Sequence, residues 1–380
     1  MEPSSRILFV DDEPRVLEGL RDVLRRQRKV WDMHFAVGGA DAIKQLDLQS
    51  FDVIVTDAKM PQIDGVTVLK YARERRPEAV RIVLSGEAGE NLALRLSPHA
   101  HQSLAKPCRI GELETTLTRA CSLRRLVADP ALRAVLGQIR ELPALPRTYT
   151  RLITALEDDR IGMLDVCHIV ETDLALSAKL LQLVNSAFFG AGRPVKTLLQ
   201  AIQLLGLELV KSLALATGVF SGDGLGAERL AFFEALQRHS MDVAYVACAL
   251  STIEERRNVF TTALLHDIGL LIELQHMPHL LTGGTPAIEW KRAEDRLHPS
   301  IGAYLLGLWG LPLDVMDCVA NHHEPLAADA TDVSKILRRA EDSLHAAEDE
   351  LGDGADPASI RDLALKIAPR IDVVPLEKTG

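Results

Sequence analysis

The first 120 residues alternate short apolar runs with amphipathic stretches, and no other feature of the chain restricts its fold more. The stretches have helical spacing, as Val16, Leu20 and Leu24 show. Several of the apolar runs are too continuously apolar to be half exposed, which is typical of strands that are buried on both faces. The pattern predicts a doubly wound α/β domain with a five-stranded parallel sheet. Its strands are expected at residues 7–10, 33–37, 51–56, 81–84 and 102–105.

Beyond residue 120 the β-like runs disappear, and almost every segment to residue 370 has helical spacing. We therefore predict a first domain over residues 1–122, a helical linker over 123–140 and an all-α domain over 141–375. Asp129 and Pro130 are residue types that favour the N-cap and first position of a helix, so a helix is expected to begin there. The glycine-rich stretch 221–227 would divide the all-α domain into two lobes.

Charge and cysteine content argue against several classes of protein. The net charge is −10, from 43 basic and 53 acidic residues, so a cationic surface for nucleic acid is not expected. The five cysteines are scattered and form no CxxC pair, which favours a reducing compartment over a disulfide framework. No run approaches the roughly 18 apolar residues of a membrane span, and the first residues do not resemble a signal peptide. We expect a cytoplasmic protein without a membrane or nucleic-acid partner.

Chemically active side chains follow four of the five predicted strands. Asp11 and Asp12 end the first strand, Asp57 the third, Ser85 the fourth and Lys106 the fifth. Ligands of open parallel sheets gather at the carboxyl ends of the strands, so these side chains are expected at one edge. Any one of these acids alone is explained by helix capping, but the full set favours a functional site. Clustered carboxylates predict Mg²⁺, with Asp57 as nucleophile toward a phosphoryl group and Ser85 and Lys106 binding its oxygens.

This constellation resembles the response-regulator receiver domain, over residues 6 to about 122. Met60-Pro61 and Gly65 also match the turn of that family after the phosphorylated strand. The resemblance implies that Mg²⁺ is held by Asp11 or Asp12, by Asp57 and by the backbone carbonyl of Lys59. It also implies that the phosphoryl donor is the phosphohistidine of a sensor histidine kinase.

One position departs from the receiver pattern. The family usually has an aromatic switch residue three positions before the lysine, and this chain has Ser103 there. The departure does not affect the expected phosphoryl chemistry. It does mean that the signal is not expected to pass through the usual aromatic side chain.

The second half contains a dispersed set of potential metal ligands. A single histidine in an apolar helix is more often a packed core residue, but an imidazole beside a carboxylate, as in His266-Asp267, is a plausible divalent-cation site. The set continues with a late acid at Glu341 or Asp342. Its histidines are His239, His266, His298, His322 and His323.

The helical half also contains several short motifs. They are Leu-Pro-Ala-Leu-Pro at 142–146, Leu-Val-Asn-Ser at 183–186, 201–206, Leu-Leu-His-Asp-Ile-Gly at 264–269, 309–312 and 322–325. Together they resemble an HDOD module, a relative of the HD metal-dependent phosphohydrolases, over about residues 135–345. The resemblance implies a non-catalytic signalling scaffold. By the HD likeness, His239, His266, Asp267 and the late acid would bind one transition metal, and His298, His322 and His323 would support a second.

Two omissions argue against hydrolase activity. Leu270 replaces the lysine that usually follows His-Asp-x-Gly, and no Gly-Tyr-Pro segment follows His322-His323-Glu324. The leading hypothesis is a phosphorylation-controlled response regulator that contacts a downstream protein through the helical module, with homodimerisation as one route of output. The rival is a phosphorylation-regulated, metal-dependent cyclic-dinucleotide phosphodiesterase, and a third reading is a receptor that binds a nucleotide without cleaving it. The sequence does not name the kinase, the downstream partner or the oligomeric state.

Overall fold

The computed structural model divides the chain into two compact units. The first holds Met1–Arg140 with Gln182–Val195 and Tyr304–Pro312, and the second holds the remainder. The domain boundaries at residues 122 and 140 stay predictions, and the segments 141–146 and 221–226 lie outside the described residues. The described residues are 5–85, 99–137, 161–185, 195–207, 227–252, 255–276, 297–327, 330–352 and 355–368, with 139, 151–152, 155 and 210.

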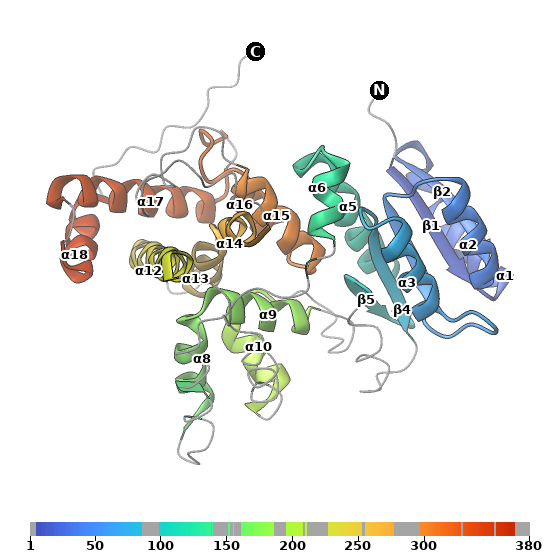
Figure 1. Cartoon of the computed structure of the whole chain (residues 1–380), viewed down its shortest axis with the longest axis horizontal. Helices are drawn as coiled ribbons and strands as arrows, with labels where there is room; N and C mark the ends of the chain where they lie inside the picture. Colours follow the sequence, from blue (N-terminus) through green and yellow to red (C-terminus); the bar gives the residue numbers. More distant parts are fainter. Residues whose placement is uncertain are drawn as a thin grey trace. The chain divides into compact units, whose positions relative to one another are not determined.

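The first unit contains the predicted five-stranded parallel sheet (Figure 1). Its strand order is β2-β1-β3-β4-β5, so the chain adds β2 on one side of β1 and then adds β3 to β5 on the other side. The strand order therefore changes direction between β1 and β3. In open sheets of this kind the ligand site lies at that reversal, outside the carboxyl ends of the strands. The strands are β1 (Ser5–Asp11), β2 (Trp31–Val37), β3 (Val53–Asp57), β4 (Val80–Ser85) and β5 (Gln102–Ala105).

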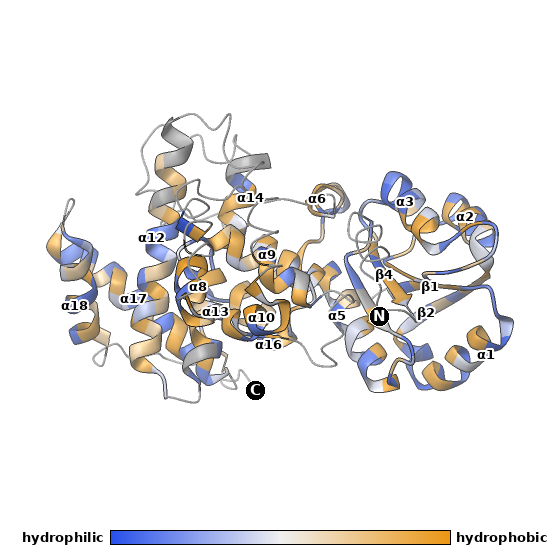
Figure 2. Ribbon diagram, turned by 90° about the horizontal axis from the view of Figure 1, so that it is seen from below, coloured by the Kyte–Doolittle hydropathy of each residue, from blue (hydrophilic) through white to orange (hydrophobic). Residues whose placement is uncertain are grey.

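Helices cover both faces of this sheet, which explains why its strands are continuously apolar. Leu8 and Val10 of β1 pack in a buried cluster with residues of α2 (Gly38–Leu48) and α3 (Gly65–Arg75). Ile7 and Phe9 alternate with them and are also fully buried. In Figure 2 the sheet lies between α2 and α3 above and two further helices below. These are α1 (Pro14–Val23) and α5 (Ile110–Leu126).

The helix predicted at Asp129 is α6 (Pro130–Leu136). The Asp129 side chain accepts a hydrogen bond from the Ala131 N–H at 2.9 Å, and Pro130 is the first helical residue, as predicted. The end of α6 is bound by the buried Arg81 of β4, whose guanidinium donates to the carbonyl of Gly137 at 2.7 Å. Within the first unit, this contact attaches the end of α6, in the second half of the predicted linker, to β4 of the sheet.

The described elements beyond residue 160 are helices, which confirms the all-α prediction. The helix α12 packs against α13 and α17, and these three supply much of the buried interior discussed below. None of the described helices is long and apolar enough to cross a membrane. The helices are α8 (Met163–Glu171), α9 (Leu174–Val184), α10 (Leu198–Leu205), α12 (Ala227–Leu250), α13 (Arg256–Leu265), α14 (Ile268–His276), α15 (His298–Leu308), α16 (Leu313–Ala320), α17 (Asp332–Leu351) and α18 (Pro357–Ile367).

Candidate functional site

Three of the predicted side chains meet at the carboxyl edge of the sheet. Val10 of β1 pairs with Thr56 of β3, so the next residues, Asp11 and Asp57, end neighbouring strands side by side. Lys106 reaches both, with its Nζ 3.0 Å from Asp11 Oδ2 and in an ion pair with Asp57 Oδ1. Both aspartates are at least nine-tenths buried. Two carboxylates with little access to water therefore share one ammonium group.

Backbone groups hold the two carboxylates in place. Asp57 Oδ2 accepts a hydrogen bond from the Lys59 N–H at 3.1 Å, and Asp11 Oδ1 accepts one from the Glu13 N–H at 2.9 Å. Burial alone would lower the pKa of Lys106, but the hydrogen bonds that its ammonium group donates to Asp57 and Asp11 outweigh burial and raise the pKa above its ordinary value. The lysine is therefore a fixed positive charge between the two acids.

The remaining predicted residues of this edge lie nearby. Ser85 ends β4 and is buried, one residue beyond Leu84, which pairs with Asp57. Asp12 follows Asp11 and is partly exposed. The Lys59 carbonyl stays a predicted ligand, and the Ser103 side chain lies outside the part of the chain whose side chains are described. The structure thus brings Asp11, Asp57 and Lys106 into direct contact.

Gly65 allows the loop after Asp57 to pack closely. Its N–H donates to the Ala58 carbonyl at 3.1 Å, and a Cβ at this position would overlap the carbonyl oxygen of Asp57. We expect Gly65→Ala to lower the free energy of unfolding by about 1–3 kcal/mol, because the backbone of the acidic edge must shift. Gly111→Ala is the matched control, since nothing lies within 4 Å of its added Cβ. Urea unfolding curves measure both, and equal midpoints for the two variants would contradict the expectation.

A second cluster of titratable side chains lies inside the helical unit. His239 comes from α12, His266 and Asp267 from the junction of α13 and α14, and His298 from the first turn of α15. His322 and His323 follow α16, and Glu341 and His345 lie on α17. Six of the described helices therefore contribute side chains, or residues next to their ends, to one cluster. All the predicted histidines meet here.

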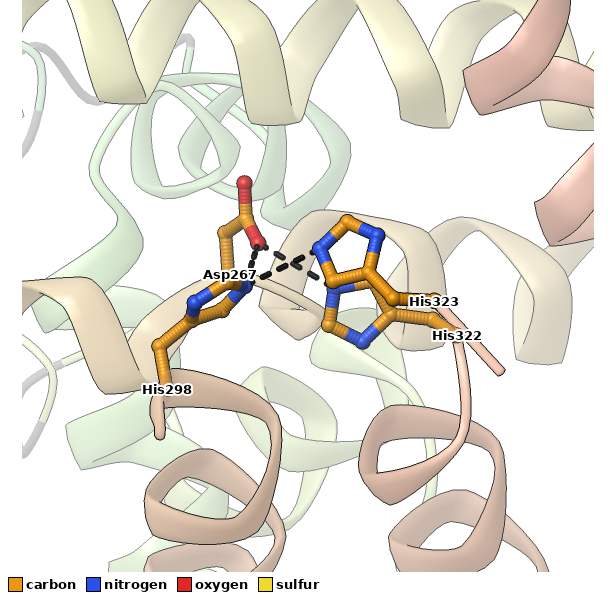
Figure 3. Close-up of side chains that lie close together, drawn as sticks. All are labelled: Asp267, His298, His322 and His323. Carbon is orange, nitrogen blue, oxygen red and sulfur yellow. Dashed lines mark hydrogen bonds and ion pairs between the residues drawn. The ribbon is translucent and has the colours of Figure 1, made fainter. Parts of the chain in front are cut away.

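Asp267 lies at the centre of this cluster. Its Oδ1 is 3.2 Å from His298 Nε2 and 3.4 Å from His322 Nε2, and its Oδ2 is 3.3 Å from His266 Nε2. His239 Nε2 lies 3.6 Å from Oδ2. Figure 3 shows His298, His322 and His323 with Asp267, where the Nε2 atoms of His298 and His323 are 3.1 Å apart. One carboxylate is thus surrounded by imidazole nitrogens.

Backbone carbonyls orient two of the imidazoles. The Nδ1 atoms of His266 and His322 lie 2.6 Å from the carbonyls of Ala263 and Val319. A carbonyl can only accept, so each Nδ1 carries a proton, and in the neutral ring Nε2 presents a lone pair to the cluster. Neither Nε2, nor Glu341 Oε2, has a hydrogen-bond partner among the described residues. Such orientation by a backbone group is typical of metal-binding histidines.

The electrostatics show how strongly these groups interact without a cation. Burial lowers the pKa of His266, but the neighbouring Asp267 outweighs burial and raises it to about 9. Burial raises the pKa of Glu341 to about 8, against the opposing charge of His266. Burial also lowers the pKa of His322 to about 4. Without a cation, the cluster therefore favours the protonated form of His266 and the neutral forms of Glu341 and His322. A bound cation would change these protonation states.

Of the two late acids, Glu341 lies in the cluster and Asp342 does not, and His345 joins the cluster as a further residue. Glu341 is 3% exposed, with its Oε1 3.4 Å from His323 Nδ1. Asp342 instead pairs with Arg338 at 3.1 Å, and its side chain is 41% exposed, so it does not belong to the cluster. His345 was not predicted, although its spacing of four residues from Glu341 places both on one face of α17.

Gly269 plays the same steric role here as Gly65 does at the sheet edge. A Cβ on Gly269 would overlap the carbonyl oxygen of His298, so glycine lets α14 approach the start of α15. This close approach is what places His298 beside Asp267. The next residue, Leu270, is 2% exposed, so an apolar side chain is packed where the related hydrolases are expected to have a lysine.

Four sets of these side chains have ligand atoms within 4.8 Å of one another, among them Asp267 with His298, His322 and His323. Imidazole nitrogens and carboxylate oxygens suit Zn²⁺, Mn²⁺ or Fe²⁺. The donor set and the buried atoms without hydrogen-bond partners both fit a divalent cation. At the sheet edge, the carboxylates of Asp11 and Asp57 are hard oxygen donors and fit Mg²⁺.

Comparisons with known protein families agree with the two predicted parts. The model of the response regulator receiver domain matches residues 7–118, and that of the HDOD domain matches residues 142–325. This chain is a receiver–HDOD response regulator. The family match confirms both resemblances stated from the sequence.

Relatives of this receiver–HDOD response regulator match only part of its length. The hydrogenase transcriptional regulatory protein HoxA of Bradyrhizobium diazoefficiens is 34% identical over 39% of this chain and 31% of its own length. The response regulator protein PilR of Pseudomonas aeruginosa is 28% identical over 39% of this chain and 33% of its own. This chain therefore spans about a third of the length of these curated relatives. The solved MmoQ response regulator of Methylococcus capsulatus is 23% identical, covering 59% of this chain and 92% of its own, with a TM-score of 0.47.

Proposed function

We propose that this response regulator accepts a phosphoryl group on Asp57 and signals through its HDOD domain by contact with another protein. The observation that carries the proposal is the convergence of Asp11, Asp57 and Lys106 at the carboxyl edge of the sheet. Receiver domain relatives imply a histidine kinase as the partner that supplies the phosphoryl group. The proposal keeps the expected cytoplasmic location.

Asp57 is the proposed nucleophile, and the other edge residues assist it. One carboxylate oxygen of Asp57 would attack the phosphorus while the bond to the donor nitrogen breaks. Lys106, which the two acids keep charged, would then pair with a phosphoryl oxygen, and Ser85 would donate a hydrogen bond to another. Asp11, Asp12, Asp57 and the Lys59 carbonyl would hold Mg²⁺, which supplies charge neutralisation when bound. The new charge changes the surface that the receiver presents.

A non-catalytic output from the HDOD domain is supported by two of its residues. Leu270 is packed in the interior, so it offers no charge to a substrate phosphate. Pro325 follows His322-His323-Glu324 in place of a Gly-Tyr-Pro segment. We therefore propose a protein partner downstream, which in one form is a second copy of this chain, and no nucleic-acid or membrane partner.

The test is phosphorylation of the purified full chain with acetyl phosphate and Mg²⁺, followed by intact mass. The wild type is expected to gain one phosphoryl group, and Asp57→Asn none, because its amide cannot form the acyl phosphate. Asp52→Asn is the matched control. Asp52 directly precedes β3, at the opposite end of the strand from Asp57, and contacts Arg6 and Arg124. An unmodified wild type, or an equal gain in Asp57→Asn, would refute the proposal.

A second candidate function, a metal-dependent cyclic-dinucleotide phosphodiesterase, is favoured by the convergence of His298, His322 and His323 on Asp267. In that case a cation bound there would supply an activated water to a phosphodiester. Incubation of Mn²⁺-loaded protein with cyclic di-guanylate separates the candidates. Hydrolysis that is lost in His322→Ala supports the phosphodiesterase, and an unchanged nucleotide supports the non-catalytic output. Calorimetric heat of binding without turnover would instead indicate a nucleotide receptor.

A further inference from the structure

The carbonyl groups at the end of α15 are bound by a side chain of the parallel sheet. Within the first unit, the Gln102 amide donates to the carbonyl of Gly307 at 2.7 Å and to that of Leu308 at 3.2 Å. The last carbonyls of a helix have no partner inside that helix, so they depend on donors from outside it. Gln102 is 3% exposed, and both hydrogen bonds are therefore shielded from water. The first residue of β5 thus caps the carboxyl end of α15.

A buried guanidinium group supports this amide. Arg119 of α5 is 6% exposed and donates to Gln102 Oε1 at 2.7 Å. Burial lowers the pKa of Arg119 to about 10, and no acid of the described residues opposes that effect. Its Nε has no hydrogen-bond partner among those residues. The carboxyl end of a helix carries a partial negative charge, which favours a cation nearby. Arg119 and Gln102 therefore suit the end of α15 in charge as well as in hydrogen bonding.

Two sequence motifs of the helical half pack at the same place in the first unit. Asn185, of the Leu-Val-Asn-Ser motif, donates to the Val195 carbonyl at 2.9 Å and accepts from the Val195 N–H at 2.7 Å. Gly310, of the motif at 309–312, has a φ of +86°, a conformation that favours glycine. A Cβ on Gly310 would lie 3.3 Å from the Asn185 carbonyl oxygen and 3.8 Å from the Arg119 guanidinium. Both motifs therefore lie beside the contact between Gln102 and α15.

The strand β5 connects this contact with the acidic edge of the sheet. Gln102 is the first residue of β5, and Lys106, which pairs with Asp11 and Asp57, directly follows the last. The four residues of β5 span about 13 Å and pair with β4 along their whole length. A displacement of Lys106 is therefore passed to Gln102 along one short strand.

We propose that Gln102 and Arg119 carry the output of phosphorylation, by holding the end of α15 in the unphosphorylated protein and releasing it when Asp57 is phosphorylated. The inference rests on the proposed function. Lys106 would leave Asp11 for a phosphoryl oxygen, and β5 would move with it, which breaks the two hydrogen bonds from the Gln102 amide. This output needs no aromatic side chain at Ser103, because the residue before it in the same strand makes the contact.

The other end of α15 belongs to the histidine cluster. Its first residue is His298, about 15 Å from Leu308 along the helix axis. His298 Nε2 lies 3.2 Å from Asp267 Oδ1. Release of the carboxyl end of α15 therefore acts on a helix whose first turn carries one of the groups around Asp267.

The test is hydrogen exchange of the full chain before and after phosphorylation with acetyl phosphate and Mg²⁺, with the extent of phosphorylation read by intact mass. In the wild type, the peptide 304–312 should exchange about tenfold faster after phosphorylation, which is the scale of one lost hydrogen bond. Gln102→Glu should exchange at the faster rate in both states. Its carboxylate still accepts from Arg119 but cannot donate to the carbonyls of α15.

Gln45→Glu is the matched control. Gln45 of α2 also donates to a backbone carbonyl, that of Phe35 at 3.1 Å, and Phe35 lies in β2 at the opposite edge of the sheet from β5. This variant should keep both the protection of 304–312 and its loss on phosphorylation. Gln102→Asn has an uncharged amide that is one methylene shorter, and it should behave as Gln102→Glu does. The pair separates the lost contact from an effect of the added charge, and a native circular dichroism spectrum shows that each variant is folded.

The outcomes separate this inference from the proposed function. No mass gain in the wild type would refute both. A full mass gain with unchanged exchange of 304–312 would overturn the inference alone. A folded Gln102→Asn or Gln102→Glu protein that keeps the wild-type protection, or the wild-type response to phosphorylation, would overturn it as well.

Discussion

Replacing Arg81 with methionine is expected to lower the free energy of unfolding by about 3–5 kcal/mol. Arg81 is 2% exposed, and burial lowers its pKa to about 10, so it stays charged at neutral pH. Its guanidinium donates to the carbonyls of His99 at 2.8 Å, of Ala79 at 3.1 Å and of Gly137 at 2.7 Å. Methionine keeps the apolar stem and removes every donor. Each buried acceptor left without a partner costs about 1–3 kcal/mol.

The matched control is Arg124→Met in the same domain. The Arg124 side chain is 40% exposed and pairs with Asp52 at 3.3 Å, so its loss should cost under about 1 kcal/mol. Hydrogen exchange of the full chain in increasing urea, measured on peptides of β4 and β5, compares the two variants. The peptide that contains α6 should also lose protection in Arg81→Met, because the bond to Gly137 is removed. Similar urea midpoints for both variants would show that the buried guanidinium does not hold this region together.

Loading the helical domain with a transition metal is expected to raise its stability by about 4 kcal/mol. This is the gain from a cation that binds only the folded state, at a free concentration a thousand times its dissociation constant. The physical reason is that Nε2 of His266, Nε2 of His322 and Oε2 of Glu341 are buried without hydrogen-bond partners among the described residues. The unfolded chain does not bring these groups together.

Thermal unfolding of chelator-stripped protein, with and without Mn²⁺, measures this gain. The protein carries Asp11→Asn and Asp57→Asn, so that any cation at the receiver edge does not contribute. Mg²⁺ should give a smaller shift, because it prefers oxygen ligands to imidazole. His322→Ala should abolish most of the shift. A melting temperature that Mn²⁺ leaves unchanged would mean that the cluster is a hydrogen-bonded core without a metal.

The sequence predicts the α/β domain closely because local patterns determine its elements. The run at 102–105 coincides with β5, and the α6 helix begins at Pro130 with Asp129 as its cap. Strand order 2-1-3-4-5 then places Asp11 beside Asp57, which needs only the fold class and the ends of two strands.

Other features depend on packing between distant segments and could not be predicted from local patterns. Whether Glu341 or Asp342 enters the cluster depends on which side of α17 faces α12 and α13. The spacing of polar residues in the sequence does not show which of these two adjacent acids is buried. Arg81 stands in a strand that otherwise looks apolar, and its partner Gly137 is 56 residues away. His345 lies one helical turn after Glu341, so the helical spacing of α17 does place it on the same face as that acid.

The most direct measurement of the central claim locates the phosphoryl group on the chain. The full protein, phosphorylated with acetyl phosphate and Mg²⁺, is reduced with borohydride, which converts an aspartyl phosphate to homoserine. Peptide mass spectrometry is expected to find homoserine at position 57 and an unchanged aspartate at positions 11 and 12. Homoserine at another aspartate, or at none, would contradict the assignment of Asp57 as the phosphoryl acceptor.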